Sequence, residues 1–316
     1  MKQKISYVLP VFNEAEGISK FWEVLIAEVA KWEPRYEFEF IFIDDGSRDA
    51  SLAILTKFAD SDSRVKIVSF SRNFGHQIAI TAGLDYADGD AVIIMDTDLQ
   101  DQPETSFELV QQWEKGFEVV FAQRRSRKDS FFKRFTASAF YRILEKFADV
   151  KIPRDTGDFR LMDAKVVLVM RKMRERNRFM RGLVASLGFK QVGVLFDRDE
   201  RFAGKTNYPL KKMIKLAVDG MLSFSSTPIT LINRLGLLLI PVGILTGILG
   251  LVLFVAGERY WSSIFLITGC VYFHSGLIIF SISIVGQYVT RIYSEVQARP
   301  LYIVSDLIGI EDRSRG

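Results

Sequence analysis

Two long uncharged apolar runs near the C-terminus constrain the fold of this chain more than any other feature of its sequence. Residues 235–257 contain no charged side chain, and residues 260–290 contain no Asp, Glu, Lys or Arg and one histidine, His274. About 20 helical residues cross the hydrocarbon core of a bilayer. The pattern predicts a transmembrane helical hairpin within residues 229–291, with spans at about 235–257 and 263–288. A pair of buried core helices is the alternative.

The charges around these runs indicate how the hairpin is oriented. The linker between the runs carries Arg259, which Glu258 offsets, and the basic residues gather on the outer flanks: Lys211, Lys212, Lys215, Arg234, Arg291 and Arg299. Excess Lys and Arg mark the cytoplasmic side of a membrane protein. The single cysteine, Cys270, leaves no intrachain disulfide, as is usual in the cytosol. We expect a multi-pass membrane protein, with the domain before the apolar runs and both termini cytoplasmic.

The net charge of +4 bears on the partners of the protein. A basic chain can bind nucleic acid or an anionic membrane surface, and clustering of the basic residues near the apolar runs favours the membrane. We therefore expect a lipid bilayer as partner and no nucleic acid. Residues 130–148 and 209–222 have the pattern of basic amphipathic helices, which predicts interfacial helices. Ordinary helices packed on the domain are the alternative.

Before residue 228, the chain alternates between β-rich runs and helical patterns. The β-rich runs are 5–9, 38–43, 65–70, 91–95 and 119–122, and the helical patterns are 17–31, 50–59, 77–86 and 104–115. This alternation predicts an α/β domain over residues 1–228, with a mostly parallel sheet and helices on both faces. Ligands of such sheets bind beyond the carboxyl ends of the strands. Residues 292–316 are assigned to a short cytoplasmic tail.

Polar motifs follow the first two predicted strands. The first strand leads into residues 10–14, which include Phe12, Asn13 and Glu14, and the second leads into the Asp-Asp-Gly-Ser motif at 44–47. Polar groups at neighbouring strand ends can hydrogen-bond a base and a ribose, and Phe12 can pack on the base. A helix cap and a tight turn are the alternative interpretation of the two motifs.

A pair of carboxylates, Asp96 and Asp98, follows the fourth predicted strand. Both can face one site if the chain turns there, and their oxygens suit Mg²⁺ or Mn²⁺. A metal at this position can bridge the two phosphates of a nucleotide-sugar and neutralise the charge of the departing diphosphate. The sequence therefore predicts a divalent metal site.

Together these motifs resemble glycosyltransferase family 2, and within it the polyprenyl-phosphate branch of bactoprenol glucosyltransferases and dolichol-phosphate mannose synthases. The resemblance covers roughly residues 5–227 and rests on these segments: 8–14, 43–47, 72–76, 95–104 and 201–206. It implies a GT-A (Rossmann-like) fold that binds a nucleoside diphosphate, and a metal-dependent glycosyltransferase activity.

The resemblance also implies roles for individual residues. Nucleotide-sugar binding is implied for Pro10, Phe12, Glu14, Asp45, Asp96, Arg201 and Lys205. Metal contacts are implied for Asp96, Asp98 and Gln100, and acceptor-phosphate contacts for Arg124, Arg134 and Ser138. Arginine suits the acceptor site because a guanidinium can bind phosphate through two hydrogen bonds. A solvated or lipid-attracting face is the alternative for Arg124 and Arg134.

An acidic residue on the acceptor side is harder to assign. The resemblance places it in residues 155–160, where Asp155 and Asp158 join Asp98 as candidate catalytic residues. A base is not strictly needed, because a phosphomonoester is largely dianionic at neutral pH. Two roles stay open, a general base and an orienter of Arg160, with Asp158 the favoured residue. His76 also has two readings, a helix cap or packing residue and a nucleotide contact.

The implied reaction is inverting transfer of a hexose, glucose from UDP-glucose, to undecaprenyl phosphate, giving a lipid-linked sugar for modification of a cell-surface glycan. Use of GDP-mannose, as in the dolichol-phosphate mannose synthases, is an alternative. A processive polysaccharide synthase is another, although the Gln-x-x-Arg-Trp motif of those enzymes is absent from the sequence. The Asp96 and Asp98 pair argues against a non-catalytic membrane scaffold. Assembly into a homo-oligomer is left open.

Overall fold

The computed structural model describes residues 2–125, 156–176, 178–196 and 260–310. The chain forms two compact units, one of Met1–Gly220 with Arg299–Gly316 and the other of Met221–Ala298. The described element of the second unit is the helix α10, Tyr260–Val296. All other described helices and strands belong to the first unit.

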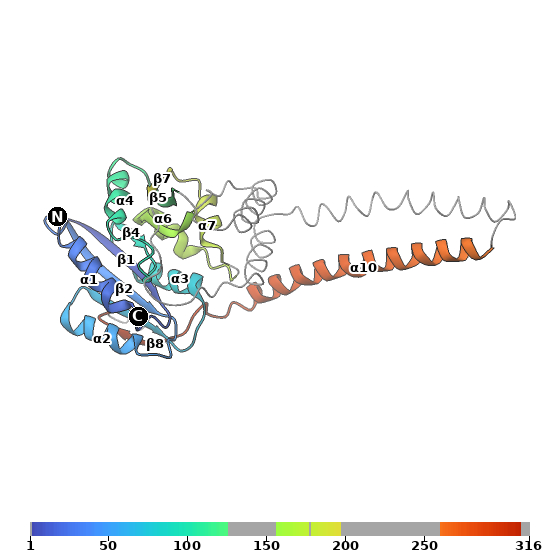
Figure 1. The fold of residues 1–316 in the computed structure, drawn as a ribbon, viewed down its shortest axis with the longest axis horizontal. Coiled ribbons are helices and arrows are strands. Elements are labelled where there is room, and N and C mark those ends of the chain that lie inside the picture. Colours follow the sequence, from blue (N-terminus) through green and yellow to red (C-terminus); the bar gives the residue numbers. More distant parts are fainter. Residues whose placement is uncertain (1, 126–155, 177, 197–259, 311–316) are drawn as a thin grey trace. The chain divides into compact units, whose positions relative to one another are not determined.

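Within the described residues, eight strands of the first unit form one sheet (Figure 1). Their order across the sheet is β7 (Gln191–Phe196), β5 (Val119–Arg124), β6 (Thr156–Asp163), β4 (Ala91–Ile94), β1 (Gln3–Val11), β2 (Tyr36–Asp44), β3 (Val65–Phe70) and β8 (Val304–Ile308). The strands β6 and β8 run antiparallel to their neighbours, and every other pairing is parallel. The mostly parallel sheet expected from the sequence is confirmed.

Three strands of this sheet were not expected from the sequence. All five β-rich runs form strands, β1 to β5, but β6, β7 and β8 come in addition. The strand β6 begins in the segment where we expected an acidic site motif. The strand β8 lies in the segment that we assigned to the tail. It is short and exposed in part, so its residues lack the continuous apolar run that marks a buried strand.

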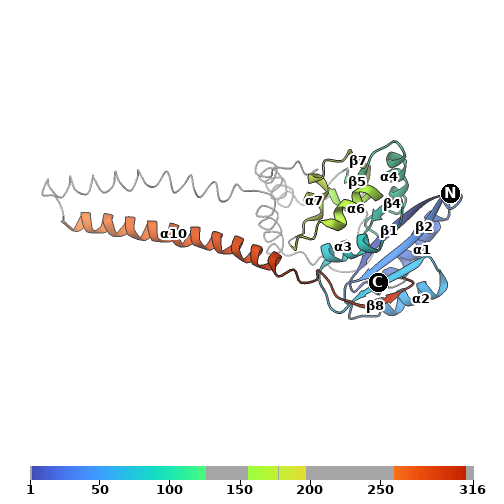
Figure 2. The same cartoon turned by 180° about the vertical axis from the view of Figure 1, so that it is seen from behind.

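Helices cover both faces of the sheet (Figures 1 and 2). The helices α1 (Ile18–Val29), α2 (Ser51–Ser61) and α4 (Thr105–Glu114) pack on one face. The helices α3 (His76–Tyr86) and α6 (Ala164–Lys172) contact each other and the strands of the other face. A short helix, α7 (Met180–Ser186), contacts β6. This covering explains why β1 and β2 are buried along almost their whole length.

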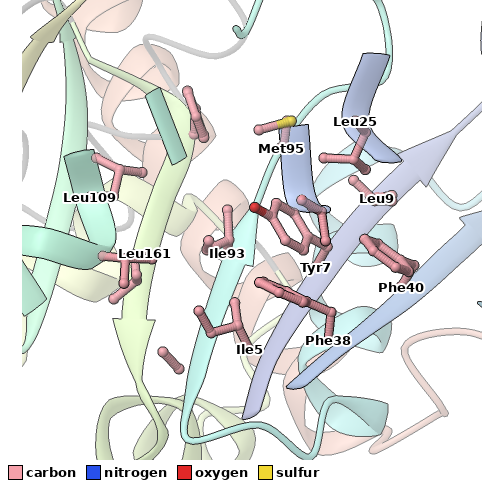
Figure 3. Packing of buried hydrophobic residues seen from close by; sticks show 14 of the residues in the cluster. Ile5, Tyr7, Leu9, Leu25, Phe38, Phe40, Ile93, Met95, Leu109 and Leu161 are labelled. Carbon is pink, nitrogen blue, oxygen red and sulfur yellow. The ribbon is translucent and has the colours of Figure 1, made fainter. Parts of the chain in front are cut away.

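The core shows the alternation that a strand imposes on its side chains. Ile5, Tyr7 and Leu9 of β1 lie on the face that Leu25 of α1 covers (Figure 3). Val8 points to the opposite face, where α3 approaches closely at Gly83. A Cβ at Gly83 would lie 2.1 Å from a methyl group of Val8. Because Gly83 has no side chain, α3 can pack directly on β1.

Several predicted segments lie outside the described residues. They are the first predicted span at 235–257 and both predicted interfacial helices, 130–148 and 209–222. The second apolar run lies in α10. None of the helices in the described part of the chain is both long enough and apolar enough to span a bilayer. The predicted hairpin stays a prediction.

The turn after β2 packs against the loop after β3, and Gly46 makes this possible. Gly46 has φ of +67°, and a Cβ added there would lie 2.5 Å from the backbone carbonyl carbon of Arg72. A left-handed φ disfavours any residue with a side chain, and backbone atoms cannot move aside as a flexible side chain can. The glycine of the Asp-Gly-Ser motif is thus explained by a close approach of two backbones.

We predict that Gly46→Ala destabilises the protein more than Gly116→Ala does. Gly116 also has a positive φ, +93°, but a Cβ there would meet no atom within 4 Å. Each variant should lose about 1–2 kcal/mol from the left-handed conformation, and Gly46→Ala should lose more because of the backbone clash. Thermal or urea unfolding of the purified full-length chain measures this. Equal losses would contradict the close approach of the two loops.

Candidate active site

The candidate site lies at the edge of the sheet where the parallel strands β1, β2 and β4 end. The antiparallel strand β6 begins at the same edge. Antiparallel pairing sets Ile94 of β4 opposite Arg160 of β6. Asp96 comes two residues after Ile94 and Asp158 two residues before Arg160, and Nε2 of His76 lies 3.5 Å from a carboxylate oxygen of each. Side chains separated by about 60 residues in the sequence therefore meet at this edge.

The segment after β1 is tied to the segment after β2. The amide of Asn13 donates to Oγ of Ser47 at 3.0 Å, and Oδ1 of Asn13 accepts from the amide of Arg48 at 2.8 Å. The amide of Glu14 donates to Oγ of Ser51 at 2.9 Å. Asn13 has φ of 55°, a conformation that asparagine tolerates better than most residues. These hydrogen bonds join the two motifs, and Phe12 in the first of them is 43% exposed.

The carboxylate of Asp45 is committed to the loop between β3 and α3. It accepts hydrogen bonds from the backbone amides of Phe74 (2.6 Å) and Gly75 (2.9 Å) and from Nδ2 of Asn73 (2.8 Å). Burial raises the pKa of Asp45 above its ordinary value, and the two backbone hydrogen bonds offset this in part. The side chain is 3% exposed, so its visible role is to hold this loop. The predicted contact of Asp45 with a nucleotide stays a prediction.

The turn after β4 carries the predicted metal ligands. The Thr97 side chain is buried and donates to the carbonyl oxygen of Pro10 at 3.2 Å, which anchors the turn to the end of β1. Asp96 and Asp98 flank Thr97, and the Asp96 side chain is about one-third exposed. Oδ1 of Asp98 accepts from the amide of Gln100 at 3.1 Å, and Leu99 adopts φ of 59°. The chain therefore turns at this point, as the metal hypothesis requires.

The carboxylates of Asp96 and Asp98 fit Mg²⁺ or Mn²⁺, but they would supply only part of the coordination shell of the metal. In the segments that the structure describes, no three His, Cys, Asp or Glu side chains gather as a metal site. Carboxylate oxygens from Asp96 and Asp98 can bind a hard divalent cation, and Mg²⁺ commonly takes its other ligands from water and substrate phosphates. The arrangement suits a metal that binds together with a diphosphate.

Asp158 is the buried anion of the site, with 8% of its side chain exposed. Its carboxylate accepts from Nε2 of Gln77 at 3.0 Å and from Nε of Arg181 at 3.2 Å, and it lies 3.5 Å from Nε2 of His76. The guanidinium of Arg160 is 4.0 Å away. Burial alone would raise the pKa of Asp158, but Arg181, His76 and Arg160 lower it well below its ordinary value. The group is therefore an anion at neutral pH.

His76 lies between the two carboxylates. Its Nε2 is 3.5 Å from Oδ1 of Asp96 and 3.5 Å from Oδ2 of Asp158. Burial lowers the pKa of an imidazole, but the two carboxylates outweigh this effect and raise the pKa of His76 to about 9. His76 is also the first residue of α3, after Gly75 at φ of +103°. It thus begins the helix, although the cap position belongs to Gly75 and no side chain caps the helix. A contact of His76 with a nucleotide stays a prediction.

Two residues of this cluster were missed from the sequence. Gln77 donates to Asp158, and its Oε1 accepts from the amide of Met180 at 2.8 Å, which ties the start of α7 to the site. A signal existed for Gln77, since it directly follows the 72–76 motif. No local signal marks Arg181, because its position depends on how α7 packs against β6.

The structure does not place the side chains of the remaining predicted site residues. Arg124 is the last residue of β5, where it pairs with Phe196, but its side chain is outside the described set. Five predicted residues lie wholly outside the described residues: Arg134, Ser138, Asp155, Arg201 and Lys205. Their roles stay predictions.

We predict that His76 titrates near pH 9 in the metal-free protein. NMR of histidine-labelled protein in EDTA, on a His274→Gln background, observes this residue alone, because the chain has two histidines. Asp96→Asn should lower the midpoint. Because the folded pKa exceeds the ordinary value of 6.5, the stabilisation from His76 is complete below pH 6.5 and is lost as the pH rises through 9. A midpoint at or below 6.5 would contradict the geometry.

Comparison with known proteins shows which family this chain resembles. Over residues 6–169, the chain matches the model of glycosyl transferase family 2. It is 46% identical to the uncharacterized glycosyltransferase YkcC of Bacillus subtilis (strain 168), over 99% of this chain and 97% of that protein. It is 39% identical to the prophage bactoprenol glucosyl transferase homolog of Escherichia coli (strain K12), over 95% and 98%.

Among solved structures, mannosyl-3-phosphoglycerate synthase from Rubrobacter xylanophilus aligns with a TM-score of 0.47 and 15% identity, over 69% of this chain and 71% of that chain. The family model covers more than half of the chain, and the relatives align over nearly its whole length. Four of the motifs on which the resemblance rests, 8–14, 43–47, 72–76 and 95–104, lie in the described residues and meet at one edge of the sheet. The chain therefore belongs to glycosyl transferase family 2.

Proposed function

We propose that this protein transfers glucose from UDP-glucose to undecaprenyl phosphate, with inversion at the anomeric carbon. The observation that carries the proposal is near full-length similarity, at 39% identity, to a protein named as a bactoprenol glucosyl transferase homolog. The site chemistry supports it. Asp96 and Asp98 form a carboxylate pair at the end of β4, beside a cluster of fixed charges.

In the proposed reaction, an oxygen of the acceptor phosphate attacks the anomeric carbon of the sugar. The bond from that carbon to the diphosphate oxygen breaks, and UDP leaves with the bonding electrons. Mg²⁺ or Mn²⁺ held by Asp96, Asp98 and Gln100 would supply charge neutralisation for the diphosphate. The acceptor is largely dianionic at neutral pH and needs no proton removed.

The environment of Asp158 favours a positioning role over that of a base. Its pKa is low and its oxygens are bonded to Gln77 and Arg181, so it is a weak proton acceptor. It instead holds Arg181 and His76 at the site. The imidazole of His76 lies 3.5 Å from Asp96, where a diphosphate bound through a metal would carry negative charge.

We further propose that the reaction takes place at the cytoplasmic face of the bacterial inner membrane. The two apolar runs would form the transmembrane hairpin, with the catalytic domain and both termini cytoplasmic. The described part of α10 exposes apolar side chains, which suits contact with lipid: Ile267, Val271, Ile278, Ile282 and Val285. Cytosolic nucleotide-sugar and the lipid headgroup can meet at this face.

The substrates are tested by incubating the full-length protein with undecaprenyl phosphate and a panel of nucleotide-sugars. Mass spectrometry of the lipid product should show one added hexose, with UDP-glucose as the preferred donor. Preference for GDP-mannose would replace the proposed donor. A polymeric product would indicate a processive synthase instead.

We predict that Asp96→Asn and Asp98→Asn each reduce transfer by at least about 100-fold, because each removes charge from the site that must hold the metal and diphosphate. EDTA should have the same effect on the parent protein. The initial rate of lipid-linked glucose formation is the measurement. Asp60→Asn, at an exposed position of α2, is the matched control. Full activity in EDTA, or in both site variants, would contradict the metal role.

We also predict that Arg124→Ala and Arg134→Ala weaken use of the acceptor far more than binding of UDP. A charge-assisted hydrogen bond is worth about 1.5–3 kcal/mol, so each variant should lose about 10- to 150-fold in kcat/KM for the lipid phosphate. Steady-state kinetics with varied acceptor and calorimetry with UDP separate the two effects. Lys20→Ala, on the exposed side of α1, is the control. Loss of UDP affinity with an unchanged acceptor response would place the acceptor elsewhere.

A further inference from the structure

The segment that follows α10 lies beside the loop that leads to His76. The strand β8 pairs antiparallel with β3, from Ile308 opposite Ile67 to Val304 opposite Phe70. One further hydrogen bond, from the amide of Ser71 to the carbonyl oxygen of Ile303 at 3.0 Å, continues this contact. The contact therefore reaches the residue directly before the 72–76 loop.

Tyr302 contacts two separate parts of the structure. Its ring stacks on Phe70, with centroids 5.1 Å apart and planes at 19°. Its hydroxyl donates to Oδ2 of Asp85 at 2.7 Å. Nη1 of Arg174 donates to both oxygens of Asp85 at 2.8 Å, which fixes that carboxylate.

The ring contact continues into the loop that the site depends on. Phe70 packs edge to face with Phe74, with centroids 5.6 Å apart and planes at 85°. The amide of Phe74 donates to Asp45, and His76 follows two residues later. Phe74 is therefore held from one side by Asp45 and from the other by the ring that Tyr302 covers.

The hydroxyl contact acts on the opposite end of the same helix. α3 begins at His76 and ends at Tyr86, and Asp85 lies in its last turn. Tyr302 thus restrains the helix that carries His76 at one end and, through Phe70, the loop that leads into it at the other. A shift of this helix or loop would change the distance from His76 to Asp96 and Asp158, which is now 3.5 Å to each.

We propose that Tyr302 is a positioning residue for the sugar transfer, a role that rests on the function proposed above. Through Phe70, Phe74 and Asp85 it holds the 72–76 loop and α3 in the orientation that sets His76 between the two carboxylates. Tyr302 follows the end of α10 within the same short connection that leads into β8. Tyr302, which would position the site through these contacts, thus belongs to the C-terminal segment of the chain.

A purely structural role at the sheet edge is the competing explanation, and the same strand offers a matched control. Ile308 lies at the other end of β8, opposite Ile67, and packs against the core. Ile308→Ala should weaken the edge without touching the loop. Tyr302→Leu removes the aromatic stacking and the hydroxyl, whereas Tyr302→Phe removes only the hydroxyl and keeps the ring on Phe70.

The first measurement does not depend on any substrate. The ring signals of His76 are recorded by NMR in full-length, histidine-labelled protein on the His274→Gln background, in EDTA and at one fixed pH. We expect Tyr302→Leu to shift these signals, Tyr302→Phe to shift them less, and Ile308→Ala to leave them in place. Unchanged His76 signals in Tyr302→Leu would overturn the proposal.

The second measurement is the kcat of transfer. Tyr302→Leu should lower kcat about two- to tenfold, the range expected for loss of one aromatic contact, and Ile308→Ala should leave kcat unchanged. If Tyr302 acts through His76, its effect on kcat shrinks in a His76→Gln background. Equal losses in both backgrounds would overturn the proposal. If the parent transfers no glucose while the His76 signals still respond, the proposed donor is wrong and the positional link stands.

Discussion

The buried carboxylate of Asp45 joins the end of β2 to the loop between β3 and α3, and the arrangement of the site depends on this connection. Three groups of that loop donate to it, which fixes the path of residues 73–75. The helix that follows begins at His76, so its first side chain is delivered to the gap between Asp96 and Asp158. Gly46 permits the close contact of the two loops on the other side.

In the resulting site, the negative charges of the carboxylates are offset by the positive charges of neighbouring side chains. Asp158 is buried among Arg181, Arg160 and His76, and this balance explains why a buried carboxylate remains charged. The same balance keeps His76 protonated. Asp96 faces His76 while remaining partly exposed, so it retains access to solvent and to a ligand. Asp158 and the cations around it therefore hold in place the residues that border Asp96 and Asp98.

The fold contributes to the site by bringing together, at one edge of the sheet, the ends of parallel strands and the beginning of an antiparallel strand. A purely parallel sheet would collect only the carboxyl ends of strands at this edge. The antiparallel strand β6 adds its amino end, and with it Asp158. At the far side of the sheet, β8 adds a strand from the C-terminal segment and places Tyr302 behind the 72–76 loop. The strand β6 thus brings a distant residue to the site, and the segment of β8 brings Tyr302 to Phe70, next to the loop that leads to the site.

The sequence by itself determined the class of fold, the five strands β1 to β5 and the segments that border the candidate site. These follow from local patterns: short apolar runs, the turns that end them and polar residues at the strand ends. It left open whether Asp158 is a base or an orienter, and it did not reveal the contacts of Asp158, Arg181 and Tyr302. Those depend on the register between β4 and β6, on how α7 packs, and on the pairing of β8 with β3. Only the tertiary structure shows these contacts, because the pKa of an ionisable group and the contacts of an edge strand are set by neighbours that are distant in the chain.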